Sequence, residues 1–220
     1  MRLLDLFAGA GGAARGYQLA GFHVTGIDNR PQPRYPFTFH EGDAMQVSVD
    51  FMRMFDVIHA SPPCQEYSTT RTMHRITYPK LVTGIVERLK ATGRPWVVEN
   101  VVGAPFEAPA LVCGSSFGLR VRRHRLFESS LALMSSGCRH DLQPSPLDVT
   151  GGGPSLKVRV DRKGGAHNKP RNIAEAREAM GIDWMTRAEL NEAVPPAYTE
   201  FIGAQLMDFL SAQDSSKDRI

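Results

Sequence analysis

Short apolar runs alternate along the chain with longer segments whose apolar residues recur every three or four positions. The runs predict buried strands over residues 3–7, 23–27, 37–40, 55–60, 96–98 and 111–113. The periodic segments predict helices over about 13–19, 79–89, 173–180, 187–191 and 197–210. Strands that alternate with helices are typical of α/β domains. The pattern therefore predicts a single α/β domain with a mixed, mostly parallel sheet.

The composition is that of an ordinary globular chain. Of the 220 residues, 42% are hydrophobic and 22% are charged, which suits one buried core with a small appendage. The chain has 26 lysines and arginines against 23 acidic residues, and this net charge of +3 is compatible with a nucleic-acid partner without indicating one. Three cysteines form no even disulfide set, and neither a signal peptide nor a long apolar run is present. We therefore expect a cytoplasmic protein with no membrane partner.

A glycine-rich turn follows the first predicted strand. The segment Ala8–Gly12 leads into a helix and places free backbone N–H groups at its N-terminus, a geometry that binds nucleotide-like cofactors. The second predicted strand ends in Asp28, 19 positions after Gly9, which is typical of an acid that binds ribose hydroxyls. NAD, FAD and S-adenosylmethionine all fit, and so does a tight turn without a ligand. Asp43, after the third predicted strand, suits either an adenine amino group or a solvated turn.

The strand at 55–60 ends in Pro62-Pro63-Cys64-Gln65. The two prolines stop the strand and fix their own backbone angles, so Cys64 lies on a stiff turn. That turn is at the carboxyl end of a strand, where open α/β sheets bind ligands. We therefore favour a nucleophilic role for Cys64 over that of a buried structural cysteine.

Two further charged positions are candidates for chemistry. Glu99 ends the strand at 96–98, where a buried carboxylate is costly unless it is paired or neutral, so it is either an acid catalyst or a structural acid. Four arginines lie within positions 120–125. We expect Arg123 and Arg125 to alternate on one strand face together with Val121, and their planar donors suit a phosphate or a base carbonyl. The alternative is a solvated basic edge strand.

Five motifs stand in order: Asp5–Gly12, Pro62–Gln65, Glu99–Val101, Arg123-x-Arg125-x-Phe127 and Ala193–Pro196. Together they resemble the cytosine-C5 DNA methyltransferase family, and the pair Pro-Cys-Gln and Glu-Asn-Val is highly specific. The resemblance covers nearly the whole chain. It implies a three-layer, Rossmann-like S-adenosylmethionine-dependent methyltransferase fold and a bacterial or phage-encoded enzyme. S-adenosylmethionine is the implied cofactor.

The resemblance also assigns roles to residues. Cys64 is the implied nucleophile that attacks cytosine C6, and Glu99 contacts N3. The arginine pair of the family corresponds to Arg123 and Arg125, of which Arg125 contacts the base carbonyl. The cofactor is implied to be held by Phe7, Gly9, Gly11, Gly12, Asp28, Asp43 and Pro63. The chain departs from the family pattern at Asn191-Glu192, where Gly-Asn is usual, and at Val121, where glutamine is usual.

The segment where the family carries its target-recognition domain is short here. We expect residues 1–127 to form the cofactor-binding and catalytic domain, 128–171 a basic, glycine-rich recognition insert containing one hairpin, 172–211 the C-terminal helices and 212–220 a polar tail. The candidate nucleic-acid contacts are Gln65, Ser68, Arg71, Arg75, Lys157, Arg159, Arg162 and Lys163. A solvated loop is the alternative for both basic stretches. Cys113, Cys138 and His140 lack the paired spacing of zinc ligands, so we predict no metal.

The predicted function is methylation of C5 of a flipped-out cytosine in DNA. The alternatives are a cytosine-C5 RNA (tRNA) methyltransferase with the same site and a catalytically silent DNA-binding or regulatory homologue. A nicotinamide oxidoreductase would explain the glycine turn and Asp28 but not Pro-Cys-Gln. DNA is the expected partner, and a protein partner that completes target recognition is compatible with the short insert.

Overall fold

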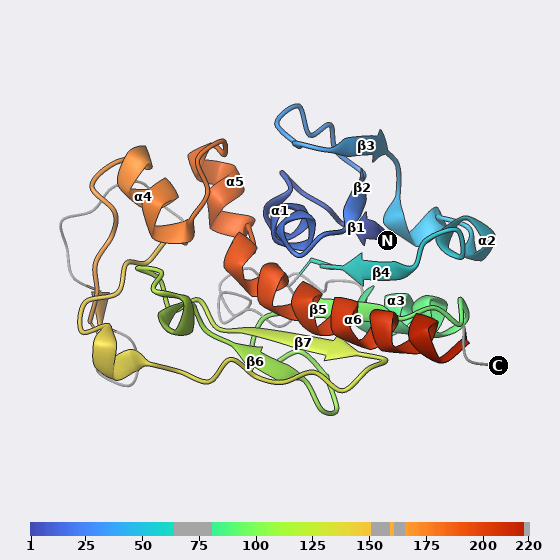
Figure 1. Cartoon of the computed structure of the whole chain (residues 1–220). Coiled ribbons are helices and arrows are strands. Elements are labelled where there is room, and N and C mark those ends of the chain that lie inside the picture. The colour runs from blue at the N-terminus through green and yellow to red at the C-terminus, as the bar shows by residue number, and fades with distance from the viewer. Residues whose placement is uncertain (64–80, 151–158, 161–165, 218–220) are drawn as a thin grey trace.

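The structure is a computed structural model that describes residues 1–63, 81–150, 159–160 and 166–217. Its centre is a seven-stranded sheet with the order β3-β2-β1-β4-β5-β7-β6 (Figure 1). The strands are β1 (Arg2–Leu6), β2 (His23–Asp28), β3 (Thr38–Glu41), β4 (Val57–Ala60), β5 (Trp96–Asn100), β6 (Ala110–Val112) and β7 (Arg125–Ser129). β1 to β5 pair in parallel, whereas β7 runs antiparallel to both β5 and β6. The predicted mixed, mostly parallel sheet is confirmed.

Helices cover both faces of this sheet, which makes three layers (Figure 1). They are α1 (Gly12–Leu19), α2 (Val49–Met52), α3 (Leu81–Lys90) and α6 (Pro196–Lys217). Neighbouring strand residues point to opposite faces, so Leu3 packs in the core on the side of α1 and α6, while Leu4 packs in the core on the side of α2 and α3. The central strands are mostly apolar because both faces are buried, and their few polar residues, such as Asp5 and His59, are buried with them.

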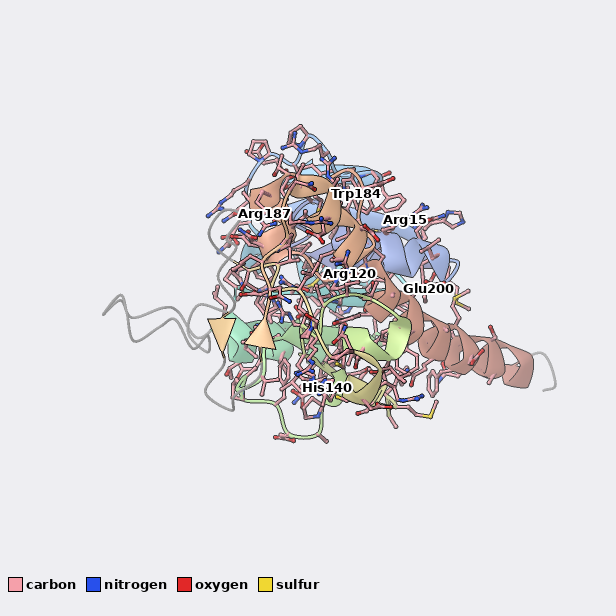
Figure 2. The ribbon with its side chains drawn as sticks, turned by 90° about the vertical axis from the view of Figure 1, so that its left-hand side faces the viewer. Arg15, Arg120, His140, Trp184, Arg187 and Glu200 are labelled. Carbon is pink, nitrogen blue, oxygen red and sulfur yellow. The ribbon has the colours of Figure 1, made fainter. Side chains whose placement is uncertain are left out.

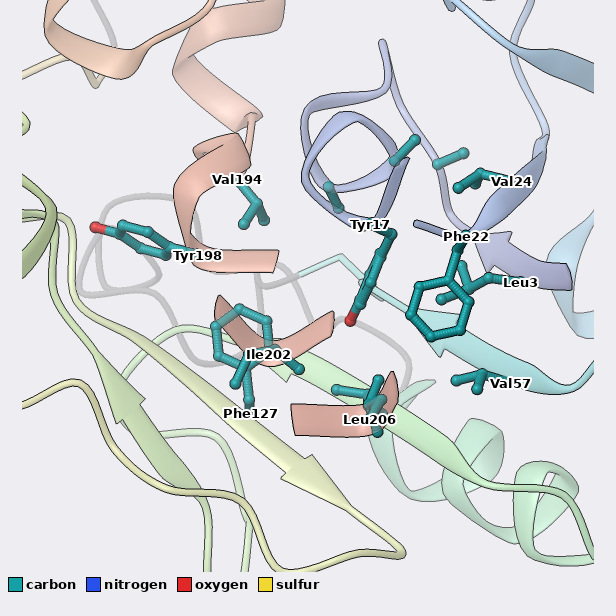
Figure 3. Packing of buried hydrophobic residues seen from close by; sticks show 14 of the residues in the cluster. Leu3, Tyr17, Phe22, Val24, Val57, Phe127, Val194, Tyr198, Ile202 and Leu206 are labelled. Carbon is teal, nitrogen blue, oxygen red and sulfur yellow. The ribbon is translucent and has the colours of Figure 1, made fainter. Parts of the chain in front are cut away.

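The core on one face joins the two ends of the chain. α1 and α6 lie side by side over the sheet (Figures 1 and 2), and Figure 3 shows their side chains meeting there. Tyr198, Ile202 and Leu206 recur every four positions on α6 and are all fully buried, as is Tyr17 of α1. Burial of a side chain such as Leu206 contributes about 1.5–3 kcal/mol to stability. The C-terminal helix therefore completes the N-terminal half of the domain.

A third apolar cluster lies beyond the carboxyl ends of the strands. α4 (Ile173–Met180) and α5 (Arg187–Glu192) pack there with Val121, Leu147 and Val149. The side chain of Asn172 caps α4, and Thr186 forms a capping box with Glu189 at the start of α5. These helices match the predicted ranges. β8 (Arg159–Val160) and β9 (Ala166–His167) pair antiparallel, as expected for the hairpin of the insert.

The expectation that Arg123 and Arg125 share a strand face is wrong. β7 begins only at Arg125, and Arg123 has a left-handed φ of 37°. The Tyr198 hydroxyl lies 2.9 Å from the carbonyl oxygen of Arg122 and 3.0 Å from that of Arg123, and the N–H of Gly114 donates to the Arg122 carbonyl. The carbonyl groups of Arg122 and Arg123 already accept these hydrogen bonds, so they are not available to accept the strand-to-strand bonds that a longer β7 would require.

Within the described ranges, no helix combines the length and the apolar character that crossing a bilayer requires.

Candidate active site

A cavity of about 550 Å³ opens at the carboxyl ends of β1, β2, β4 and β5. This is the edge where open α/β sheets bind their ligands. The cavity is walled on its other side by residues of α5 and by the segment that leads into α6. Seven of the predicted site residues line it: Phe7, Gly9, Gly12, Asp28, Pro63, Glu99 and Arg125. Residues distant in sequence are thus brought together as the strand-end pattern predicted.

The glycine-rich turn is fixed by close packing. Gly11 caps α1 with a left-handed φ of 85°, which favours glycine. A Cβ atom at Gly12 would lie 2.4 Å from the carbonyl oxygen of Val194, so only glycine lets the segment before α6 approach the helix this closely. The indole N–H of Trp184 donates to the Ala10 carbonyl at 2.8 Å. The contribution of Trp184 has no signature in the sequence, since the residue lies 174 positions away.

Asp28 is positioned to accept hydroxyl groups. Its Oδ2 accepts a hydrogen bond from the Gly9 N–H at 2.9 Å, and its Oδ1 accepts one from the Arg30 N–H at 3.0 Å. Each carboxylate oxygen has more than one acceptor site, so both can still accept from a ribose. Asp43 lies differently. Its side chain accepts from the Met45 N–H at 2.9 Å and caps a short 3-10 helix, Ala44–Gln46, and the cavity lining does not include it.

The backbone at Pro62 is held by the side chain of Asn100. The side-chain amide of Asn100 donates to the Pro62 carbonyl at 2.9 Å, and its oxygen accepts from the Val101 N–H. Asn100 is 1% exposed, so the bond is shielded from water. Cys64 itself lies outside the described residues. The Asn of Glu-Asn-Val therefore fixes the backbone immediately before the predicted nucleophile, a role that sequence reasoning did not assign.

A buried polar chain lies beneath the same turn. Asp5 Oδ1 is 2.8 Å from His59 Nδ1, and His59 Nε2 is 3.4 Å from the Ser61 hydroxyl. Asp5 and His59 are both fully buried. The carboxylate, the imidazole and the hydroxyl thus form a continuous polar chain that reaches the cavity, which Asp5 and Ser61 both line. Burial, together with the nearby Asp5 and Glu99 charges, raises the pKa of the adjacent Tyr17 hydroxyl well above its usual value, so Tyr17 stays protonated.

Glu99 and Arg125 form a buried ion pair at the cavity. Glu99 Oε1 and Arg125 Nε are 2.9 Å apart, and the two side chains are 7% and 14% exposed. The Nε–H bond of Arg125 does not point at this oxygen closely enough to form a hydrogen bond. Glu99 Oε1 therefore has no hydrogen-bond partner within the described part of the chain. An ion pair with unfilled donor and acceptor sites, facing a cavity, is suited to a polar ligand.

Arg123 has a different environment from Arg125. Its guanidinium donates to the carbonyl oxygens of Ala193 at 2.9 Å, Asn191 at 2.6 Å and Val149 at 3.1 Å. The side chain thus braces the segment before α6, where this chain departs from the family pattern, and the cavity lining does not include it. Its contact with a base carbonyl stays a prediction.

The predicted nucleic-acid contacts are mostly beyond the described ranges. Gln65, Ser68, Arg71, Arg75, Lys157, Arg162 and Lys163 lie outside them, and of Arg159 only the backbone is described, in β8. Two other cations of the basic insert have acidic partners. Lys169 Nζ is 2.9 Å from Asp148 Oδ2, and Arg171 Nε is 3.3 Å from Glu175 Oε2.

The described residues fit S-adenosylmethionine. The cavity volume is in the range of small-molecule sites, roughly 300–1,000 Å³. Asp28 suits the ribose, and the start of α1 offers backbone N–H groups. Asn191 Oδ1, which is buried beside the cavity without a hydrogen-bond partner among the described residues, offers an acceptor for a cationic or N–H group.

Comparison with known proteins agrees with this site. Residues 1–104 match the family model for C-5 cytosine-specific DNA methylases. The chain is 32% identical over 114 residues to the type II methyltransferase M.HgiGI of Herpetosiphon aurantiacus, covering 46% of this chain and 90% of that protein. It is 36% identical over 80 residues to M.HgiDI of the same organism, but spans only 26% of that protein and 31% of this chain.

Solved structures share the fold over almost the full length. A proposed DNA modification methyltransferase encoded within an E. coli prophage superposes with a TM-score of 0.65 at 16% identity, over 96% of this chain and 99% of that one. S. pombe Dnmt2 superposes with a TM-score of 0.58 at 12% identity and the same coverage. The sequence matches and the strand-end site agree, and the chain belongs to the C-5 cytosine-specific DNA methylase family of S-adenosylmethionine-dependent cytosine-C5 methyltransferases.

Proposed function

We propose that this protein methylates C5 of a flipped-out cytosine in DNA through a covalent adduct on Cys64. The observation that carries the proposal is the Glu99–Arg125 pair, which lines the cavity together with the Pro62–Pro63 turn. Asn100 links the two features, because it follows Glu99 on β5 and bonds the Pro62 carbonyl. An acid and a planar cation at one cavity, with a thiol two positions after Pro62 in the sequence, are the groups that attack on a cytosine ring requires.

Cytosine C5 is a poor nucleophile until the ring is activated. In the proposed reaction the Cys64 thiolate forms a bond to C6, and the electron pair of the C5–C6 double bond moves toward C5 and the N3–carbonyl system. Glu99 takes up a proton from solvent as the base binds, contacts N3 and donates that proton there, while the guanidinium of Arg125 stabilises the charge on the carbonyl oxygen. S-adenosylmethionine, when bound, supplies the methyl group to C5. Water then takes the C5 proton, N3 returns its proton to Glu99, and the electron pair of the C5–H bond re-forms the C5–C6 double bond as the Cys64 thiolate leaves.

The cofactor contacts follow from the cavity. We assign the ribose hydroxyls to Asp28 and the surrounding wall to Phe7, Gly9, Gly12 and Pro63, and Gly11, which is outside the cavity lining, to the shape of the turn that starts α1. Asp43 is assigned to the adenine amino group, although its side chain already caps the Ala44–Gln46 turn. Each assignment predicts a loss of cofactor affinity on substitution.

Recognition is assigned to the short insert at 128–171. Lys157, Arg159, Arg162 and Lys163 would contact phosphates, which position a protein on DNA without reading its sequence. We therefore expect a short or degenerate target site. Mismatched cytosines should be good substrates, because flipping an unpaired base costs less free energy.

A trapping experiment tests this proposal. A DNA duplex and an RNA of the same sequence, each carrying 5-fluorocytosine, are incubated with S-adenosylmethionine and the wild-type or Cys64→Ser protein. Because fluorine at C5 blocks the final elimination, intact mass should show a protein–DNA adduct for the wild type only. Calorimetry should show near-normal cofactor binding by Cys64→Ser. An adduct formed equally well by Cys64→Ser refutes the nucleophile, and an adduct formed with RNA alone selects the RNA methyltransferase alternative.

A further inference from the structure

Four potential metal ligands converge outside the active-site cavity: Cys113, His124, Cys138 and His140. One ligand atom from each lies within 4.8 Å of all the others. They come from separate parts of the fold, since Cys113 follows β6, His124 directly precedes β7, and the other two lie in the segment after β7. Figure 2 shows His140 on this face of the molecule, below Arg120 in that view. Such convergence of sulfur and imidazole groups requires a physical explanation.

Two sulfur–nitrogen distances within the cluster are close to the edges of a tetrahedral site. Cys113 Sγ is 3.3 Å from His140 Nε2, and Cys138 Sγ is 3.3 Å from His124 Nε2. With zinc–sulfur bonds of about 2.3 Å and zinc–nitrogen bonds of about 2.0–2.1 Å, a tetrahedron has sulfur–nitrogen edges of about 3.5 Å and a sulfur–sulfur edge of about 3.8 Å. The two histidine rings are tilted by 53°, with centroids 5.1 Å apart, so both can point a nitrogen at one centre.

The donor set selects the class of metal. Two sulfur and two imidazole ligands, with no carboxylate in the group, favour zinc over calcium or magnesium. Cys113 is fully buried, and its Sγ also lies 3.0 Å from the Ser115 hydroxyl, which can act as an outer-shell partner for the thiolate. Four protein ligands fill a tetrahedral zinc completely, which is typical of structural rather than catalytic sites.

We propose that Cys113, His124, Cys138 and His140 form a structural zinc site. Zinc would join the end of β6, the start of β7 and the first part of the insert. His124 lies between Arg123, which braces the segment before α6, and Arg125, which pairs with Glu99. The metal would thus hold the arginine segment against the sheet.

Metal analysis of the full-length protein tests the site directly. Protein purified without chelators should contain one equivalent of zinc by elemental analysis. Cys138→Ser and His140→Asn should each lower the zinc content well below one equivalent. His40→Asn is the matched control, because His40 is an exposed histidine remote in sequence from the cluster, and it should retain the full equivalent.

Cobalt provides a second readout that needs no variant to fold. Wild-type protein reconstituted with Co²⁺ should show the visible absorption of a tetrahedral thiolate–imidazole site, and zinc should displace it. Substoichiometric zinc with no tetrahedral Co²⁺ spectrum would overturn the proposal. So would a Cys113–Cys138 disulfide in metal-free protein, or unchanged zinc in Cys138→Ser and His140→Asn. None of these readouts depends on methyl transfer, so they are independent of the proposed function.

Discussion

The two halves of this chain are built by different means. Up to residue 104, where the family model matches, parallel strands end at one edge of the sheet and deliver Asp28, Pro63 and Glu99 to the cavity. After that point polar links join separate segments in addition to the apolar packing of α4, α5 and α6, for example Arg123 to three backbone carbonyls and Arg120 to Glu175. In the first half the sheet positions the residues that line the cavity. In the second half individual side chains also hold neighbouring segments together.

This difference predicts which changes affect chemistry and which affect stability. A residue at a strand end of the first half can be altered without disturbing the sheet, so its loss should appear in turnover or cofactor affinity. A bracing residue of the second half holds distant segments together, so its loss should appear in the free energy of unfolding.

Glu99→Gln should have the largest effect. The amide keeps the shape of the side chain but cannot supply a proton to N3, so we expect methyl transfer to fall about 10²–10⁴-fold. Cofactor affinity by calorimetry should stay near that of the wild type. Glu107→Gln changes an exposed acid after the same strand and should leave the rate unchanged. A Glu99→Gln enzyme with nearly full activity would remove Glu99 from the reaction.

Asp28→Ala should weaken S-adenosylmethionine binding. Hydrogen bonds to a charged group contribute about 1.5–3 kcal/mol each, so we expect a roughly 10- to 150-fold higher Kd. Asp50→Asn, at a side chain that is 89% exposed, serves as the control. Unchanged affinity would exclude the ribose contact, and tight binding of NAD in place of S-adenosylmethionine would favour the oxidoreductase alternative.

Arg123→Lys should affect stability more than chemistry. Lysine keeps the charge but cannot reach three carbonyl groups in the same plane, so we expect a loss of about 1–2 kcal/mol in the free energy of unfolding by urea. Arg94→Lys, at an exposed arginine that bonds the Arg53 carbonyl, should cost less. If Arg123→Lys instead lowers kcat with stability intact, then Arg123 belongs to the catalytic group and not to the brace.

Glu175→Gln should have the smallest effect, a change in Tm that is measurable only at acidic pH. The backbone N–H of Arg171 and the guanidinium groups of Arg171 and Arg120 lower the pKa of Glu175 from 4.5 to about 2, against the opposing effect of burial. Its contribution to stability is therefore full above pH 4.5 and is lost as the pH falls toward 2. Glu175→Gln should flatten the decline of Tm over this window, whereas Glu200→Gln, an exposed acid on α6 (Figure 2), should not. An unaltered decline in Glu175→Gln would contradict the assignment.

The features predicted best from the sequence are the strands and helices, because a local pattern of residues determines them. Apolar runs located six of the seven strands of the sheet, all but β7, and the residues at their ends, such as Asp28 and Glu99, meet at the cavity. The helices at 173–180 and 187–192 also follow from their periodicity and caps. These strands and helices depend on residues that are close to one another in the sequence, so they can be predicted from the sequence alone.

Long-range contacts were not predictable in the same way. The strand expected across Arg123 is wrong because Tyr198, 75 positions away, bonds its carbonyl. Trp184 and Asn100 support the site through bonds to backbone atoms, which any sequence could supply. His124 escaped notice as a ligand because it lies within a run of arginines and has no paired spacing with Cys113.

The most direct test is a map of 5-methylcytosine on a random-sequence DNA duplex treated with the full-length protein and S-adenosylmethionine over a range of salt concentrations. We expect methylation at C5 of cytosines in a short or degenerate context. Its yield should fall steeply as salt rises, because phosphate contacts release counterions. Absence of 5-methylcytosine, or a single long recognition site that is methylated with little dependence on salt, would contradict the account.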